Sequence, residues 1–141
     1  MRKRTQGREY TLQLLYQFEI NPQELDSLLI SFWTEHAEVS SEIRNFAEDL
    51  VKGTVQHLEE LDKVIERYTE NWHLNRMAAI DRNILRFATY ELLFLSDIPP
   101  KVTINEAVNI AKKYSKEDSG KFVNGVLDKI NHTEKARTSL S

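Results

Sequence analysis

Apolar residues recur at helical spacing near the start of the chain. Tyr10, Leu14 and Phe18 follow one another at steps of four, with Leu15 beside them. That period places their side chains on one face of a helix, which the sequence predicts over residues 4–20. Asn21-Pro22 then stops this helix and can start the next, because Asn caps helices and Pro suits the first helical position. A shorter helix is predicted over residues 24–36.

The middle of the chain predicts two more helices. Ser40-Ser41 opens a long one. Its inward residues are Ile43, Phe46, Ala47, Leu50, Val51 and Leu58. A further helix carries Leu61, Val64, Ile65 and Tyr68. The polar stretch "ENWHLN", residues 70–75, interrupts the pattern and predicts a break.

The second half predicts three helices and no strand. The strongest apolar stripe runs at steps of four, four, four and three through Ile80, Ile84, Ala88, Leu92 and Leu95. "SDIPPK", residues 96–101, ends that helix because proline breaks the hydrogen-bond ladder. Thr103 and Glu106 form a capping box, so the next helix is expected to start there. Residues 116–130 complete the set. We expect an all-α, single-domain bundle of about six or seven helices over residues 1–141.

Composition narrows the class of protein. The 141 residues suffice for one domain with a real core. The absence of cysteine excludes disulfides, thiol nucleophiles and thiolate metal sites. No stretch approaches the roughly 20 apolar residues of a transmembrane helix, and the charged N-terminus lacks the apolar run of a secretory signal. We therefore expect a cytoplasmic protein that does not partner with a membrane.

The charge is distributed unevenly. The net charge is only −3. The first nine residues nevertheless contain four cations, Arg2, Lys3, Arg4 and Arg8, and a single acid, Glu9. This pattern predicts a basic N-terminal arm over residues 1–8 that could meet phosphates. Residues 132–141 are expected to form a short polar tail.

No grouping of residues argues for catalysis, a metal or another cofactor. Glu70-x-x-His73 matches half of a di-iron motif, but the second half is missing and it lies in a helix break. A solvated helix surface explains His57 and Glu60. Gly120-Lys121 lacks the preceding glycine of a phosphate-binding loop. The sequence therefore predicts a protein that is not an enzyme.

Several side chains fall away from the predicted core stripes. Tyr16 shares a row with Arg8 and points nearly opposite the core centre, so it either packs against another helix or is exposed for stacking. Arg82 and Arg86 are neighbours one turn apart, with Arg76 just before their helix. They form either a solvated face or part of an RNA-binding surface.

The last helix raises a question because it contains a glycine. Glycine in a helix interior is less favourable than alanine by about 1 kcal/mol. At about 100° per residue, Gly125 falls away from the buried stripe, in the sector of Asp118, Lys121 and Phe122. We interpret it as a bare patch that a base or a partner's backbone could approach. The alternative is a tolerated glycine with Phe122 packed in the core.

The same segments carry a family resemblance. "REYTLQLLYQFE", "NWHLNRMAAIDRNILRFATYELLF" and "IPPKVTINEAVNIAKKYSKEDSGKFVNGVLDKI" resemble the NusB family of transcription antitermination factors. The match runs from about residue 8 to residue 130, and its last segment is the most specific. The resemblance implies an all-helical adaptor without enzymatic activity. It also implies a heterodimer with the ribosomal protein NusE that binds single-stranded boxA RNA and helps RNA polymerase read through terminators in ribosomal RNA operons.

The resemblance also implies roles for particular residues. RNA contacts are expected at Arg2, Lys3, Arg4, Arg8, Tyr16, Arg76, Arg82, Arg86, Asp118, Lys121 and Phe122. Contacts with NusE are expected at Tyr16, Asp81 and Leu85. Family members also suggest a homodimer when unbound. Two alternatives remain open: a protein-interaction module without RNA affinity, and a stand-alone relative of the helical domain of ribosomal RNA methyltransferases. The chain has no glycine-rich segment for a methyl donor, so we prefer the stand-alone adaptor.

Overall fold

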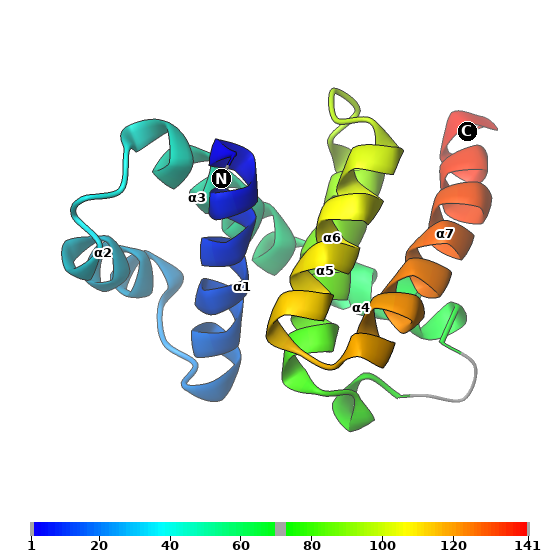
Figure 1. Ribbon diagram of the computed structural model, residues 1–141, viewed down its shortest axis with the longest axis horizontal. Helices are drawn as coiled ribbons and strands as arrows, with labels where there is room; N and C mark the ends of the chain where they lie inside the picture. Colours follow the sequence, from blue (N-terminus) through cyan, green and yellow to red (C-terminus); the bar gives the residue numbers. More distant parts are fainter. Residues whose placement is uncertain (1, 70–72, 141) are drawn as a thin grey trace. The chain divides into compact units, whose positions relative to one another are not determined.

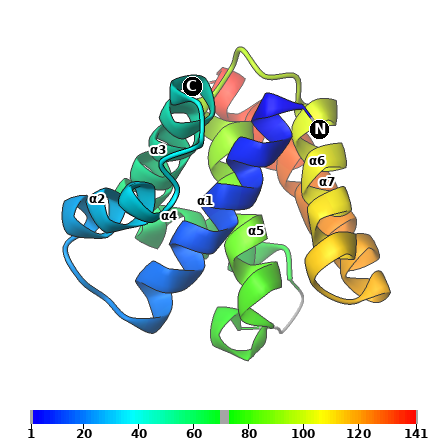
Figure 2. The ribbon, with the colours of Figure 1, turned by 60° about the vertical axis from the view of Figure 1, so that its left-hand side comes forward.

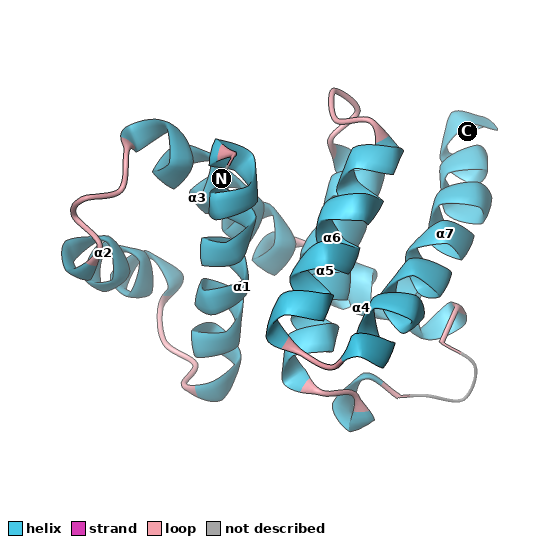
Figure 3. Ribbon diagram, in the orientation of Figure 1, coloured by secondary structure: helices cyan, strands magenta, loops and turns pink. Residues whose placement is uncertain are grey.

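The described chain is mainly helical. The computed structural model describes residues 2–69 and 73–140. Over these residues it has seven α-helices, one short 3-10 helix and no strand (Figure 3). The all-α prediction is therefore confirmed. Contacts between residues divide the chain into two compact units, Met1–Gln56 and His57–Ser141. The expectation of one domain stays a prediction.

The first unit contains three helices, α1 (Lys3–Ile20), α2 (Leu25–Glu35) and α3 (Ser41–Gln56), which pack on one another (Figure 2). Leu14 of α1 and Leu50 of α3 are completely buried. An aromatic cluster joins α1 to α2, where the Tyr10 ring meets Phe32 and Trp33 edge-on at centroid distances of 5.9 and 5.7 Å. Burying these apolar side chains supplies most of the stabilisation of such a small unit.

The second unit contains α4 (Leu58–Arg67), the 3-10 helix η1 (Leu74–Arg76), α5 (Ala79–Phe94), α6 (Pro100–Tyr114) and α7 (Glu117–Leu140). Helices α5, α6 and α7 pack against one another in pairs, and α4 packs on α5 (Figure 1). The predicted stripe of α5 is buried at its centre, since Ile84 and Ala88 are fully enclosed. Val123, Leu127 and Ile130 of α7 are fully enclosed as well.

The start of α6 differs from the prediction. The helix begins at Pro100, with Pro99 as its N-cap, so the expected capping box at Thr103 is wrong. Proline fits the first helical position because its missing N–H would have no intrahelical partner there. The Thr103 hydroxyl instead donates a 2.8 Å hydrogen bond to Glu91 Oε1 in the buried interior. The Thr103 side chain, which the capping box predicted to bond to the start of its own helix, therefore makes a tertiary contact with α5 instead.

Other element boundaries also shift. The long helix predicted to include Leu58 ends at Gln56, and Leu58 begins α4. Helix α2 begins only at Leu25, three residues after Pro22. The basic segment expected as an arm forms the first turns of α1, and the segment expected as a polar tail continues α7 to Leu140. Glu70 of the rejected di-iron motif lies outside the described residues.

Candidate nucleic-acid interface

The first turns of α1 carry three exposed cations. Arg2 occupies the N-cap position without a side-chain capping hydrogen bond, and Lys3 and Arg4 follow it on the surface. Lys3 Nζ lies 2.8 Å from Glu42 Oε2 of α3, and both side chains are more than half exposed. The pKa of Glu42 lies below its ordinary value of 4.5. The main cause is the hydrogen bond from Lys3, followed by the Lys3 charge, and the Arg4 charge contributes less. The pair is a weak surface interaction that a phosphate could replace.

Arg8 does not belong to this exposed set. The Arg8 residue is only 1% exposed, so the expectation of a surface cation at this position is wrong. Its guanidinium carbon lies 5.3 Å from the Phe46 ring centroid, and that of Arg4 lies 5.1 Å from the same ring. Gly7 makes this packing possible, because a Cβ there would stand 2.7 Å from Phe46 Cδ2. The cation–π contact gives Arg8 a structural role.

Tyr16 emerges from α1 with 40% of its surface exposed. Leu12, one turn earlier in the same row, is buried. The row of Arg8, Leu12 and Tyr16 is therefore a second face of α1 that is buried at Arg8 and Leu12. Tyr16 lies at its exposed end and is accessible to a partner.

In the second unit, Phe122 of α7 lines two cavities. The first has a volume of about 300 Å³ and the second about 260 Å³. The first is lined by Met77, Ala78, Asp81, Ser115, Lys116, Asp118, Ser119 and Phe122. The second is lined by Tyr68, Thr69, Lys121, Phe122, Gly125, Val126 and Lys129. The structure thus brings together Asp118, Lys121 and Phe122, as the sequence analysis expected, and leaves the ring half-buried.

Gly125 forms an open part of the second cavity. A Cβ built at Gly125 would meet no atom within 4 Å, apart from its own helix backbone and chain neighbours. The glycine therefore makes no room for a neighbouring helix, and the prediction of a bare patch beside Phe122 and Lys121 is confirmed. Lys121, Gly125 and Lys129 stand one helical turn apart, so the spacing could have identified Lys129 as a further cation here.

Asp81 is a buried residue that lines the first cavity. It is 9% exposed, and its Oδ2 accepts a 3.0 Å hydrogen bond from Ser119, whose Oγ also lies 2.9 Å from Ser115 Oγ. Oδ1 is buried and has no hydrogen-bond partner within the part of the chain that is described. A buried carboxylate oxygen without a donor is unfavourable, so the Asp81 carboxylate is held in this cavity by the Ser119 hydrogen bond alone among the described residues. The Ser115–Ser119–Asp81 link joins residues too far apart for sequence spacing to reveal.

The remaining predicted residues divide into exposed and structural ones. Arg76 is exposed at the end of η1. Arg82 donates hydrogen bonds to the carbonyls of Leu74 and Met77 at 2.8 and 2.9 Å, which fastens η1 to α5. Leu85 is fully buried, so the expectation that it contacts a protein partner is wrong.

Arg86 is also engaged inside the second unit. It pairs with Asp62 of α4 through two hydrogen bonds and donates a third, of 3.1 Å, to Asn83 Oδ1. A guanidinium held by a carboxylate in two places has little freedom to bind a phosphate. The structure therefore assigns Arg82 and Arg86 to holding helices in place.

Neither a metal centre nor a membrane span is found among the described residues. They contain no group of three or more acidic or histidine side chains that could hold a metal ion. His57 stacks on Phe94 at a centroid distance of 4.3 Å, which accounts for its position without an acid–base role. None of the described helices combines the length and apolarity needed to cross a bilayer.

Comparisons with known proteins define the family. The model of the NusB family matches residues 5–132. A transcription antitermination protein NusB from Thermodesulfovibrio yellowstonii is 46% identical over 137 residues, covering 91% of each chain. The solved T. maritima NusB is 42% identical with a TM-score of 0.84, covering 92% of this chain and 91% of the other. A chain in the crystal structure of antitermination factors NusB and NusE in complex with dsRNA is 32% identical with a TM-score of 0.84, covering 94% of this chain and 98% of the other.

These matches span nearly the whole chain and agree with the helical fold. The chain therefore belongs to the NusB family of transcription antitermination factors, and the predicted family is confirmed. The family is non-enzymatic, so the chain is not an enzyme.

Proposed function

We propose that this chain binds single-stranded boxA-type RNA together with the ribosomal protein NusE, and so supports processive transcription of ribosomal RNA operons. The observation that carries the proposal is the position of Phe122, which is half-buried, lines two small cavities and lies beside Lys121 and the open surface of Gly125. An aromatic face next to a cation and a bare backbone suits an unpaired base and its phosphate.

The exposed cations supply the electrostatic part of the proposal. Arg2, Lys3 and Arg4 at the start of α1 and Arg76 at the end of η1 are exposed cations available to phosphates. They bind without sequence preference, whereas the half-buried ring and the neighbouring carboxylates select among bases. Arg8, Arg82 and Arg86 are left out of the proposed RNA surface because their guanidiniums hold the structure together.

NusE is proposed to dock at Asp81, with Tyr16 as a further contact. Asp81 lines the first cavity, and a basic side chain of a ribosomal protein in that cavity would offset its charge. Asp118, an exposed carboxylate that lines the same cavity, stays with the proposed RNA contacts. A solved relative has been crystallised with NusE and dsRNA, which supports both partners. The wider proposal places the pair in the RNA polymerase antitermination complex of the cytoplasm, with a homodimer as the unbound state.

A mobility-shift titration tests the proposal. A short boxA-like single strand, the same RNA as a duplex and an unrelated single strand are each titrated with this chain, with and without NusE. We expect the tightest complex with the boxA strand and NusE together. If NusE associates but the RNA affinity of the mixture equals that of NusE alone, this chain is a protein-interaction module and the RNA proposal fails.

A further inference from the structure

The outward side of α6 carries cations that the proposed function does not use. Six exposed side chains fall within one arc of about 120°, since each residue turns the helix by about 100°. They are Lys101, Val102, Asn105, Asn109, Lys112 and Lys113, and we call them the α6 face. The arc lies opposite the buried Ala107 and Ala111. Glu106, the one acid of α6, is half-buried at its edge, so the α6 face itself is basic.

Helix stability alone does not explain these lysines. Lys112 and Lys113 stand in the last turn of α6, where they suit the negative end of the helix dipole. Lys101 stands in the first turn, where the dipole favours an acid, and that turn contains none. A cation therefore occupies an unfavourable position on the same face, which indicates that the face has an anionic partner.

The ammonium groups at both ends of the α6 face are open to such a partner. Lys101 and Lys112 are exposed, and neither side chain forms a hydrogen bond, an ion pair or a ring contact with another described residue. An anion that binds there has no internal carboxylate to displace among the described residues. Its attraction to the face is therefore undiminished by competition.

The α6 face continues toward the site proposed for a base. Gly120 of α7 is buried, and a Cβ there would stand 2.9 Å from Lys112 Cγ and 3.0 Å from Lys112 Cε. The stem of Lys112 thus lies along the glycine that directly precedes Lys121 and Phe122. Lys116, between α6 and α7, lines the first cavity together with Phe122. A strand bound at Phe122 therefore has a path of cations onto α6.

The composition of the α6 face favours a nucleic acid over a protein. Lysine is depleted at protein–protein interfaces, whose centres are apolar, and Val102 is the one apolar side chain of this face. Lysine and asparagine side chains are by contrast common donors to phosphates along a strand. Lys101 and Lys112 are about 16 Å apart along the helix axis, far enough to contact separate phosphates of one strand.

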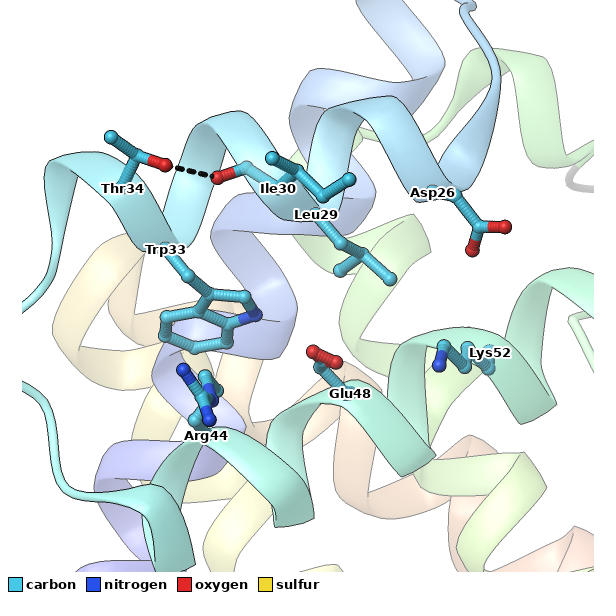
Figure 4. A pocket seen from close by; sticks show the side chains of 8 residues that line it. All are labelled: Asp26, Leu29, Ile30, Trp33, Thr34, Arg44, Glu48 and Lys52. Carbon is cyan, nitrogen blue, oxygen red and sulfur yellow. Dashed lines mark hydrogen bonds between the residues drawn. The ribbon is translucent and has the colours of Figure 1, made fainter.

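A cavity in the first unit shows the opposite case. It has a volume of about 540 Å³ and lies between α2 and α3. Arg44 and Lys52 line it, but Asp26 and Glu48 do so as well, so its charges balance (Figure 4). Cations on such a surface give no net attraction for a phosphate, and Lys52 therefore serves as a control.

We infer that the α6 face binds the phosphate backbone of the RNA outside the boxA-type element, as a track for nucleotides that flank the base at Phe122. The inference rests on the proposed function and extends the RNA surface of the second unit. The track makes no choice among bases, because contacts with phosphates carry no sequence information directly. Its effect is a longer RNA footprint and a higher affinity at low salt.

A titration with core and extended RNAs tests the α6 face. The RNAs are the boxA-type strand alone and the same strand with about eight uridines added at the 5′ end or at the 3′ end. Each is titrated with the full chain in complex with NusE at several salt concentrations. We expect at least one extension to raise affinity about tenfold at low salt and to steepen the log–log salt slope by about 2, because three lysines gain phosphates. Equal affinities for all three RNAs would overturn the inference.

Matched variants show whether the gain arises on α6. Lys101→Gln combined with Lys112→Gln should remove most of the gain from the extension and leave the affinity for the core strand unchanged. Lys52→Gln combined with Lys63→Gln removes the same charge from exposed positions of α3 and α4 and should leave both affinities unchanged. Equal losses in the two variants, or equal losses on core and extended RNA, would show a general charge effect and overturn the inference.

The core strand separates this inference from the proposed function. If the core strand binds and the extensions add nothing, the α6 track fails while the proposed function stands. If the core strand does not bind, the proposed function fails, and oligouridine alone decides the track. Oligouridine binding that the α6 variant loses would then support the track, and binding that it keeps, or none at all, would overturn it. A loss of NusE affinity in the α6 variant, with extended RNA bound as by the wild type, would make the face a protein surface and overturn the inference.

Discussion

Arg86 binds both carboxylate oxygens of Asp62. Its Nε donates to Oδ1 at 2.8 Å, and a terminal nitrogen donates to Oδ2 at 2.9 Å. The two side chains are 11% and 25% exposed and join α5 to α4. A bidentate pair shielded from water in this way is a structural clamp. It gives the second of the two predicted helix arginines a structural role, and its contact with RNA stays a prediction.

Arg86→Leu should therefore destabilise the fold. It leaves a partly buried carboxylate without its partner, and we expect a loss of about 2 kcal/mol in the free energy of unfolding. Urea denaturation measures this loss, and replacing Asp62 with Leu as well should recover part of it. Full stability combined with a clear loss of RNA affinity would return Arg86 to the RNA surface.

The exposed cations of α1 should control the salt dependence of RNA binding. Replacing Arg2, Lys3 and Arg4 with Gln removes three phosphate contacts, so the log–log salt slope should flatten by about 2. Filter binding with the NusE complex at several salt concentrations measures the slope. A variant with Gln at Lys52 and Lys63, both exposed, is the charge control. Identical slopes for the triple variant and the wild type would refute the role of this turn.

The Lys3–Glu42 pair predicts a pH dependence. Because the pKa of Glu42 is lowered in the folded state, the pair's stabilisation is present above pH 4.5 and is lost as the pH falls through the lowered pKa. Lys3→Gln should raise the pKa of Glu42 toward 4.5. An NMR titration of the Glu42 carboxyl carbon measures it, with Lys63→Gln as the control. An unchanged pKa in Lys3→Gln would show that the pair does not form in solution.

Replacing Gly125 should change the stability of the protein and its RNA affinity in opposite directions. Gly125→Ala should stabilise the protein by about 0.5–1 kcal/mol, because alanine is the better helix former and its Cβ meets open space. The same methyl group should weaken RNA binding if a base lies on the bare patch. Asn124→Ala, an exposed change one residue earlier, is the control. A stabilised Gly125→Ala protein with full RNA and NusE affinity would leave the glycine without a functional role.

Much of the fold follows from the period of apolar residues. The stripe through Ile84 and Ala88 and the stripe through Val123 and Leu127 are buried as the spacing predicts. Boundaries were less predictable, because Thr103 satisfies Glu91 across two helices instead of capping its own. A local motif cannot reveal that a distant buried carboxylate needs the same hydroxyl.

The candidate site was predictable where it depends on one helix. Lys121, Phe122 and Gly125 share a sector of α7, and the structure places them around one cavity. The prediction of an exposed Arg8 is wrong because a charged side chain need not lie on the surface, and Gly7 and Phe46 create a buried place for its guanidinium. The Asp81–Ser119 bond spans 38 positions of the chain, and no periodicity encodes such a contact.

The central claim is that Phe122 stacks on a base of the RNA. The most direct measurement compares Phe122→Ala with Phe94→Ala, which removes another partly exposed ring of the second unit, and records RNA affinity in the NusE complex together with melting temperature. The account predicts that Phe122→Ala loses about 1–3 kcal/mol of RNA binding while Phe94→Ala binds as the wild type does. A Phe122→Ala protein that melts at a lower temperature but binds RNA with unchanged affinity would contradict the account and make Phe122 a core residue.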